Sequence, residues 1–561
     1  MKSKKMFAAV VAFVLALSVG LTGCGKSQQA GNNSNDKIDK DQYLNLILPA
    51  DVKTLDSSKA TDSYSGQIIG EVMEGMTRIT NDGQKDKVEL AGAEKIDKSE
   101  DGLTWTFHLR DYSWSDGKKV TAEDFKYAWL RLLDPNTASD YAYFIFDIKN
   151  AAEYNAGNAK AEDVGIKVID EKTLQVTLNN PVPYFDQIVA FKNLVPLRKD
   201  IVEAAGETYG QDPAKLVYNG PFVVEQWVKG SKVVLKKNEK YWDAKSVKLQ
   251  TVNFQVVKEE ASRMKMFETK QLDAVGARGE YLTKYKEQAQ KGQIAYMTGY
   301  APSSTYVFFN VNDKSKVFSS PKVRLAFSLA LDREDYVKNV MKRYYAAYGW
   351  APYALLNGDK EYRKEVPEPL KAAMEQYKDP KALFQEGLKD LGLDPNKQYE
   401  FLYLSSGTDT LTRTLDEWYQ KQWETKLGVK IKIESTSDFP QFVDRVDRGE
   451  YQISAMGWAG DYNDPMTFFD MFTTGNGNNP GKWSNKDYDA LVDKVRKEAD
   501  FNKRLELFKQ MEEILVVKDA GIAPVAYRDK HLFLQNYVKG FQAPLFGMDY
   551  EIKYAYTSGR Q

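Results

Sequence analysis

Cysteine and histidine are almost absent from this chain of 561 residues, which holds one cysteine, Cys24, and two histidines, His108 and His531. A disulfide framework needs pairs of cysteines and a cysteine-rich zinc site needs several, so the sequence excludes both. A Ser-His-Asp triad would need one of the two histidines. His108 stands among the polar residues of the alternating stretch TWTFHLR, which is typical of a solvated strand position. We therefore predict no catalytic residue, no metal site and no cofactor.

An excess of charge of one sign is also missing, since 78 Lys and Arg residues face 79 Asp and Glu residues. A protein that follows a phosphate backbone needs a basic surface, so we do not expect nucleic acid as a partner. Long hydrophobic runs are missing as well beyond the N-terminus, and no later segment is apolar enough to span a bilayer.

The N-terminus carries a secretory signal pattern. Lysines at positions 2, 4 and 5 precede the apolar run 6–21, and the segment 1–23 is too short and wrongly flanked for a retained span. It ends at Leu-Thr-Gly-Cys24, which resembles the bacterial lipobox, in which the signal is cut before a cysteine that carries a diacylglycerol. The stretch 24–41 is polar and without periodicity, as in a flexible tether. We expect a body anchored by lipid to the outer face of the cell membrane, which is the periplasmic side where an outer membrane exists.

The body is too long for one hydrophobic core, because cores stop growing near ~250–300 residues. Strand and helix patterns alternate along it, which indicates α/β lobes. Residues with strand patterns are 43–49, 104–110, 173–178, 232–238 and 428–435. Residues with helix patterns are 120–133, with Thr121 as N-cap, 321–334, with Pro321 in the first turn, and 411–427.

One short stretch, GWAGDYNDP at 457–465, combines glycines, aromatic residues and acids. Asn463, Asp464 and Pro465 are typical of a turn that enters a helix, with Asp464 as N-cap and Pro465 at the first helical position. Asp461 is then the acid that the turn does not use. The stretch alone leaves two interpretations open: a plain turn, or a site where Asp461 meets a cation.

Several motifs resemble those of the family 5 extracellular solute-binding proteins, which serve peptide and nickel ABC importers, and they are most similar to the oligopeptide-binding members. They occur in the family's order and cover nearly the whole body. The matching stretches are WTFHLRDYSWSDGKKVTAEDFKYAW (105–129), NNPVPYF (179–185), NGPF (219–222), NEKYWD (238–243), VRLAFSLALDRE (323–334), LGVKIKI (427–433), MGWAGDYNDP (456–465) and APVAYR (523–528).

The resemblance implies an α/β fold of the periplasmic-binding-protein type II kind, with two ligand-binding lobes joined by a hinge and a third, extra lobe. Hinge closure would enclose the ligand. The expected bounds are 42–73, 201–305 and 528–561 for a discontinuous lobe I, 74–200 for the extra lobe II, and 306–527 for lobe III.

The resemblance also implies the ligand-binding residues. In the family, the acid of the GW-x-x-D-Y motif grips the α-ammonium of a peptide, and Asp461 stands at that position. The other positions that match binding residues are the backbone-pairing segment Gly457, Trp458 and Ala459, the tyrosines Tyr141 and Tyr527, Ser63 in the loop 61–63, and Phe439, where the family often has a tryptophan. Trp458 and Phe439 also suit a plain core, and so do the two tyrosines.

Two departures concern the carboxyl end of the ligand. Many oligopeptide binders have an arginine where this chain has Ala455, and a histidine in the segment that corresponds to 405–414, which has none here. Two alternatives follow: the protein has no fixed carboxylate clamp and prefers longer peptides, or Arg413 supplies the cation.

The function predicted from the sequence is an oligopeptide-binding lipoprotein, not an enzyme, that delivers peptides to an ABC permease. We expect a monomer. Alternatives are a peptide-signal (pheromone) receptor on the same scaffold, a nickel or haem binder, which the scarcity of histidine disfavours, a hydrolase using Asp461 and Asp464 as acid and base, and a structural adhesin.

Overall fold

The computed structural model describes residues 37–81, 85–437 and 439–560, and the segment Ile38–Gln561 forms one unit. The predicted signal peptide 1–23, the predicted lipidation site Cys24 and the predicted tether up to residue 36 lie outside the described residues. Among the residues that are described, none of the helices combines the length and the apolarity that a bilayer crossing requires.

A four-stranded sheet contains the first described strand. Its strands, in sheet order, are β1 (Tyr43–Leu48), β10 (Thr251–Val256), β9 (Lys232–Lys237) and β8 (Phe222–Val228). β1 is parallel to β10, and the other pairs are antiparallel. The side chain of Gln42, just before β1, donates a hydrogen bond to the Thr557 carbonyl oxygen at 3.0 Å. The start, the middle and the end of the chain therefore meet at this sheet.

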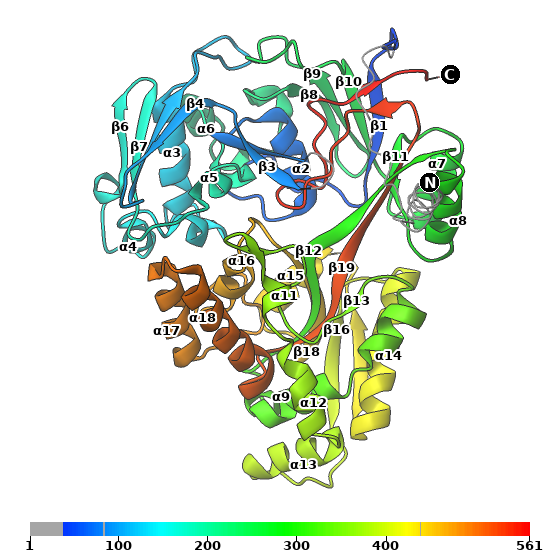
Figure 1. Ribbon diagram of the computed structural model, residues 1–561. Coiled ribbons are helices and arrows are strands. Elements are labelled where there is room, and N and C mark those ends of the chain that lie inside the picture. The colour runs from blue at the N-terminus through cyan, green and yellow to red at the C-terminus, as the bar shows by residue number, and fades with distance from the viewer. Residues whose placement is uncertain (1–36, 82–84, 438, 561) are drawn as a thin grey trace, which may run out of the picture. The chain divides into compact units, whose positions relative to one another are not determined.

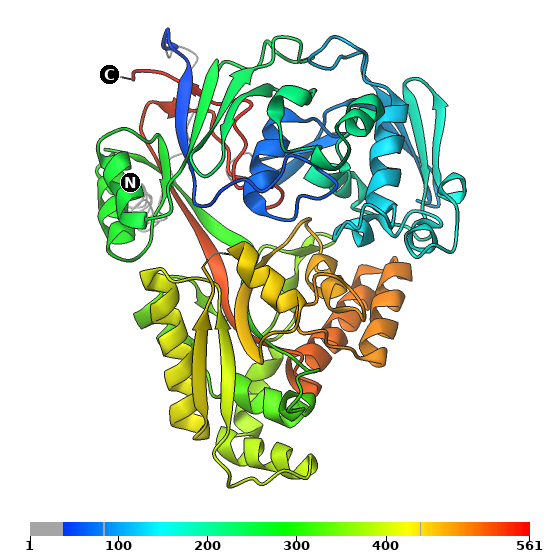
Figure 2. The same ribbon diagram turned by 180° about the vertical axis from the view of Figure 1, so that it is seen from behind.

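A seven-stranded sheet holds the two longest strands, β12 and β19. Its path is β11 (Ala274–Gly276), β19 (Ile522–Leu534), β12 (Ala295–Phe309), β18 (Ile453–Ala459), β16 (Glu400–Ser405) and β17 (Lys430–Ser435), with β13 (Tyr345–Ala346) beside β19. β12 and β19 pair antiparallel along most of their length, with a shift of register between Tyr300 and Ser304. In both views they run side by side, from the neighbourhood of β11 to that of β16 and β18 (Figure 1, Figure 2).

A third sheet, also four-stranded, packs against helix α3 (Ala122–Leu133). Its strands, in order, are β4 (Ala93–Lys98), β5 (Thr104–Leu109), β7 (Thr173–Thr177) and β6 (Ile166–Asp170). α3 begins where it does because the Asp124 carboxylate accepts the backbone N–H of Thr121 at 2.9 Å, which satisfies a donor that the helix leaves free. Trp129 of the helix meets Phe107 of β5 edge to face, with ring centres 6.4 Å apart.

The remaining elements connect and cover the sheets. The helices are α2 (Ser63–Val72), α4 (Ala151–Asn155), α5 (Phe185–Ile188), α6 (Lys199–Ala205), α7 (Glu260–Glu268), α8 (Gly279–Gln290), α9 (Pro321–Leu329), α10 (Arg333–Asp335), α11 (Tyr362–Glu365), α12 (Pro369–Gln376), α13 (Pro380–Asp390), α14 (Thr410–Leu427), α15 (Phe439–Asp447), α16 (Met466–Phe469), α17 (Lys486–Lys497) and α18 (Phe501–Glu513). Three short strand pairs are β2 (Thr77–Asn81) with β3 (Asp86–Leu90), β14 (Leu356–Asn357) with β15 (Lys360–Glu361), and β20 (Val538–Lys539) with β21 (Tyr556–Thr557).

The elements predicted from the sequence are present, with two differences at helix ends. The five strand patterns correspond to β1, β5, β7, β9 and β17, and the helices at 120–133 and 411–427 correspond to α3 and α14. The helix predicted over 321–334 ends at Leu329, because Asp332 caps a separate helical turn by accepting the N–H of Asp335 at 3.0 Å. The helix predicted to start at Pro465 begins one residue later.

Candidate ligand-binding site

The second half of β18 has a free edge. On one side it pairs with β12, where Thr305 is the register partner of Gly457. On the other side β16 pairs only with residues 453–454, so in the described part of the chain the backbone of 455–459 has no neighbouring strand there. Gly457 and Ala459 are exposed. An unpaired strand edge presents N–H and C=O groups to which another extended chain can bond.

Asp461 lies at the end of this edge and is fixed by its own backbone. The preceding N–H, of Gly460, donates to the carbonyl oxygen of Pro302 at 2.8 Å, and the N–H of Asp461 donates to Oγ1 of Thr467 at 2.9 Å. The side chain is half-buried, and its Oδ2 atom is shielded from solvent without a hydrogen-bond partner among the described residues. A buried acceptor of this kind costs free energy until a donor reaches it. The loop therefore holds a carboxylate oxygen that lacks its donor.

Tyr141 and Lys192 face Asp461 from a distant part of the sequence, and the three residues are called here the Asp461 cluster. Burial raises the pKa of Asp461 to about 7, while the Lys192 ammonium and the Tyr141 hydroxyl lower it. Nζ of Lys192 lies 5.6 Å from the centre of the Tyr141 ring and donates to the carbonyl oxygen of Asp62 at 3.4 Å. Burial also lowers the pKa of Lys192, and the charge of Asp461 opposes that shift. The acid and the two donors are thus electrostatically coupled.

Two further contacts hold the facing segments together. The ring of Tyr462 stacks on that of Tyr184, with centres 5.0 Å apart and planes 12° from parallel. The N–H of Asn463 donates to Oε1 of Gln187 at 3.0 Å. Because Tyr184 and Gln187 precede Lys192 by a few residues, these contacts hold the segment that carries Lys192 against the loop that carries Asp461.

Asp464 has a different environment from Asp461. It forms a buried ion pair with Arg504, in which both carboxylate oxygens lie 2.7 Å from Nη2, and it accepts the N–H of Met466 at 2.9 Å. Both of its oxygens are therefore engaged in structural contacts, and Asp461 is the acid of this loop with an uncommitted oxygen.

Two more of the predicted residues lie close to the cluster. Trp458 is half-buried, and its indole N–H donates to the Thr467 carbonyl oxygen at 2.9 Å, which ties β18 to the residue that also bonds Asp461. Ser63 is exposed at the start of α2, directly after Asp62, whose carbonyl oxygen accepts from Lys192.

Three predicted residues are not brought to the cluster. Phe439 is exposed and packs on Phe442 with ring centres 5.8 Å apart, and Arg413 is exposed in the first turn of α14. Tyr527 is fully buried, and its hydroxyl accepts the N–H of Gly349 at 3.1 Å. Its side chain leaves the sheet on the face that packs inward, whereas the resemblance implied a place in the ligand cleft.

The sequence reasoning missed Lys192, Gln187 and Arg528. Lys192 is the one charge in the apolar stretch VAFKNLVP at 189–196, and that isolation was a usable signal. The amide of Gln187 had no comparable signal. Arg528 closes the motif APVAYR, and its place beside Gly457, 71 positions earlier in the chain, depends on the sheet.

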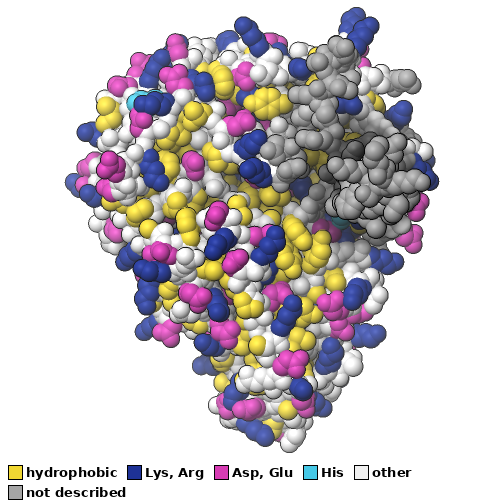
Figure 3. All heavy atoms as spheres, viewed as in Figure 1, with side chains coloured by type: hydrophobic (Ala, Val, Ile, Leu, Met, Phe, Trp, Pro, Cys, Tyr) yellow, Lys and Arg dark blue, Asp and Glu magenta, His cyan; other side chains and the backbone are white. Residues whose placement is uncertain are grey.

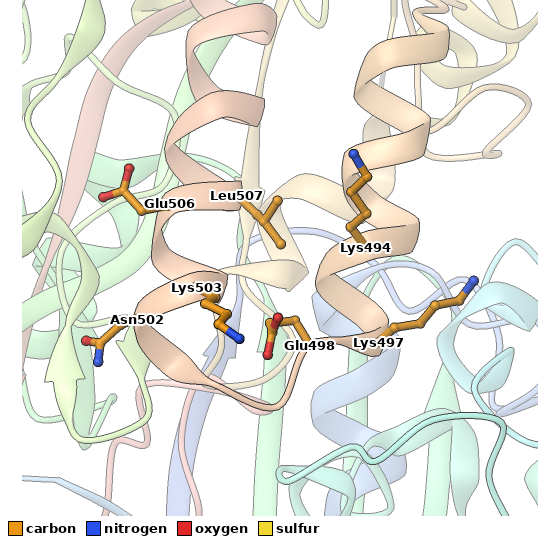
Figure 4. Close-up of a pocket in the computed structure, with 7 residues that line it drawn as sticks. All are labelled: Lys494, Lys497, Glu498, Asn502, Lys503, Glu506 and Leu507. Carbon is orange, nitrogen blue, oxygen red and sulfur yellow. The ribbon is translucent and has the colours of Figure 1, made fainter.

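The described pocket between two helices involves no residue of the Asp461 cluster. One pocket lies between α17 and α18 and is lined by the long side chains of both helices and their connecting turn (Figure 4). On the face drawn in Figure 3, basic and acidic side chains are interspersed over the described residues. The described residues include no group of three or more His, Cys, Asp or Glu side chains placed to hold a metal ion.

Known proteins share the sequence pattern and the fold of this chain. Residues 87–480 match the family described as bacterial extracellular solute-binding proteins, family 5 Middle. The oligopeptide-binding protein OppA of Bacillus subtilis (strain 168) is 31% identical over 96% of this chain and 98% of its own. The substrate-binding domain of an oligopeptide ABC transporter from Bacillus anthracis str. Ames has a TM-score of 0.83 and 33% identity, over 93% of this chain and 100% of that one. The pheromone receptor PrgZ has a TM-score of 0.82 and 28% identity, over 92% of this chain and 100% of that one.

The fold is therefore that of the type II periplasmic binding proteins, a mixed α/β architecture built for ligand capture. The chain belongs to the bacterial extracellular solute-binding proteins of family 5. It is a binding protein rather than an enzyme, as the family is.

Proposed function

We propose that the protein captures peptides along the free edge of β18, binds their α-ammonium group at Asp461, and delivers them to an ABC permease. The observation that carries the proposal is the position of Asp461. Its Oδ2 atom lacks a donor and lies at the end of a strand edge that lacks a partner. Both features suit a ligand that combines an extended backbone with a terminal cation.

The strand edge would bind the peptide backbone, which all peptides share. A peptide that pairs with residues 455–459 would continue the sheet in the place where β16 stops. Each such hydrogen bond contributes ~0.5–1.5 kcal/mol net and depends on no side chain. Exposed Gly457 and Ala459 leave room for another backbone to approach. Peptides of varied sequence are therefore the expected ligands.

Asp461 would fix the direction and register of the peptide. A charge-assisted hydrogen bond to an ammonium group contributes roughly 1.5–3 kcal/mol, and more of that energy is retained where solvent is excluded. Lys192 stabilises the ionised form of Asp461, because its positive charge opposes the rise in the pKa of Asp461 that burial causes. An α-ammonium at Oδ2 would supply the missing donor.

Enclosure of the ligand would follow from motion about β12 and β19. We propose the three lobes with the bounds given above, so the changes between lobes at 305/306 and 527/528 fall inside these strands. The register shift between Tyr300 and Ser304 is a suitable hinge, because a β-bulge bends a strand. Contacts such as Tyr184 with Tyr462 would then form on closure, and a ligand that bonds both sides shifts the population toward the closed form.

The anchor and the partners complete the proposal. A signal peptide at 1–23, lipid on Cys24 and the polar tether would hold a monomeric body at the outer face of the membrane, close to the permease. The relative from Bacillus anthracis is itself described as the substrate-binding domain of an oligopeptide ABC transporter, which supports the choice of partner.

A second function on the same scaffold is reception of a peptide signal. The similarity to the pheromone receptor PrgZ favours it. The two functions differ in selectivity: a receptor binds one sequence tightly and random peptides poorly, whereas a nutrient importer binds many sequences with similar affinity.

Native mass spectrometry of the purified protein tests the proposal. Co-purified peptides of several masses support capture for transport, and one dominant peptide supports reception of a signal. A protein that carries no peptide and binds none from a random hexapeptide library contradicts both functions. Recovery of intact peptides after prolonged incubation would exclude the hydrolase interpretation.

A further inference from the structure

Arg528 emerges from β19 on the face of the sheet opposite to Tyr527. Neighbouring residues of a strand point to opposite faces, so the buried ring of Tyr527 places the next side chain on the other side. Thr305 is the register partner of both Gly457 and Ala526, so these three residues lie on one face of the sheet. Arg528 lies two positions after Ala526 in β19 and therefore shares the face of Ala526. Arg528 therefore stands on the same face as Gly457.

The guanidinium lies directly over Gly457. A Cβ atom at that glycine would collide with Nη2 of Arg528 and would lie 2.7 Å from its Cζ atom. On the other side, Nε of Arg528 donates to Oγ1 of Thr305 at 3.2 Å. The glycine thus provides the space in which this cation rests against the strand whose edge is free.

Arg528 lacks a carboxylate partner in the described part of the chain. Of its five N–H donors, only the one on Nε has a hydrogen-bond partner there, and the two terminal nitrogens are not sealed from solvent. Three other half-buried or buried arginines are paired with a carboxylate: Arg343 with Asp529, Arg504 with Asp464 and Arg363 with Glu512. The buried Arg333 has no carboxylate partner, but backbone carbonyl oxygens and Oγ of Ser328 accept its N–H groups. The site therefore keeps a planar, donor-rich cation available beside the proposed ligand position.

We propose that Arg528 binds a carboxylate of the ligand. The inference rests on the proposed function and adds a second charged contact to it. Gly457 and Asp461 are four positions apart, which is at most about 13 Å of extended chain. A peptide whose α-ammonium lies at Asp461 would bring its third to fifth residue to Arg528. The carboxylate is then either the C-terminus of a short peptide or an acidic side chain at that place in a longer one.

Tyr64, in the first turn of α2, faces the same region. Burial raises the pKa of Tyr64, and the positive charges of Arg263 and Arg528 lower it, so the hydroxyl lies within electrostatic reach of the guanidinium. A carboxylate held by Arg528 would thus lie between the free strand edge and the segment that carries Ser63.

Isothermal titration calorimetry with two matched pairs of peptides tests the proposal. The first pair is tetra-alanine with a free or an amidated C-terminus. The second is an amidated hexapeptide of alanines with aspartate or asparagine as its fourth residue. We expect loss of the carboxylate to weaken binding to the wild-type protein roughly ten- to hundredfold in one pair, which identifies the source of the carboxylate.

The variants decide whether Arg528 is the cation. Arg528→Gln should bind the two members of that pair with affinities within about threefold of each other, and Arg528→Lys, which keeps the charge but not the fork of donors, should retain part of the preference. Arg413→Gln tests the alternative cation and should retain the full preference; loss of the preference in this variant instead of in Arg528→Gln would also overturn the proposal. The same preference in Arg528→Gln as in the wild type, or none in the wild type, would overturn the proposal.

The failure of this inference and that of the proposed function are distinguishable. If N-acetylation of tetra-alanine still weakens binding but the carboxylate preference does not depend on Arg528, only the assignment of Arg528 falls. If neither pair of peptides binds, both fall.

Discussion

Lys192 lowers the pKa of Asp461 although 269 positions separate the two residues in the sequence, and the Oδ2 atom of that acid still has no hydrogen-bond partner. The Lys192 ammonium therefore stabilises the negative charge of Asp461, while the Oδ2 atom stays available to a second donor. A ligand that brings a second cation into direct contact gains an ion pair whose desolvation is already partly complete. This relationship underlies the predictions that follow.

The affinity for peptides should depend on pH in a bell-shaped manner. Burial raises the pKa of Asp461 to about 7, so below that pH the free site is increasingly protonated and must lose a proton to bind an ammonium group. Affinity should fall up to about tenfold per pH unit as the pH drops below 7. It should also fall above about 8, where a peptide's α-amino group loses its proton. Calorimetry from pH 5 to 9 measures both limbs.

Asp461→Asn is the control for the fall in affinity below pH 7, which is called here the acid limb. The asparagine side chain does not titrate, so the affinity of this variant should be constant from pH 5 to 7. An equal fall in affinity in this variant would show that another group takes up the proton, which would contradict the role of Asp461.

Removal of the Lys192 charge should shift the acid limb to higher pH. The ammonium lowers the pKa of Asp461, so its loss in Lys192→Met lets that pKa rise further. At pH 6.5 the variant should bind less tightly than the wild type, and the difference should shrink toward pH 8. Lys199→Met is a matched control, since Lys199 is exposed at the start of α6. If the pH midpoint of the acid limb stays in place or moves to lower pH in Lys192→Met, Lys192 does not lower the pKa of Asp461.

The Asp464–Arg504 pair should contribute to stability rather than to binding. Asp464→Asn leaves a buried arginine without its charge partner, which typically costs about 3–5 kcal/mol of unfolding free energy. Urea denaturation measures the loss. The control is Asp444→Asn, which breaks an exposed pair with Arg448 and should cost under about 1 kcal/mol. Equal losses in the two variants would show that the buried pair contributes no more to stability than the exposed one.

Local patterns made the secondary structure predictable. The alternation in TWTFHLR gave the buried and polar faces of β5, including the outward position of His108, and Thr121 with Asp124 marked the start of α3. Such patterns depend on neighbouring residues along the chain, so they can be recognised without knowledge of the tertiary fold. The end of α9 was missed because Asp332 starts a new cap within an otherwise helical pattern.

The site was predictable only where it lies in one stretch of sequence. Asp461 could be singled out because Asp464 and Pro465 have local roles in the turn. The free edge of β18 could not be, since it depends on the residue at which β16 stops pairing. Parity along β19 fixes Tyr527 and Arg528 on opposite faces, but the sequence does not show which face packs inward.

The binding of free and N-acetylated forms of one peptide to the wild type and to Asp461→Asn tests whether Asp461 binds the α-ammonium group of the ligand. Calorimetry at pH 7.5 should show that Asp461→Asn loses roughly 3–5 kcal/mol of affinity for the free peptide. N-acetylation should weaken binding to the wild type and add little to the loss in the variant, because both changes remove the same ion pair. Asp493→Asn, at an exposed position on α17, should bind as the wild type does. A loss below about tenfold in Asp461→Asn, or equal binding of free and N-acetylated peptide by the wild type, would contradict the account.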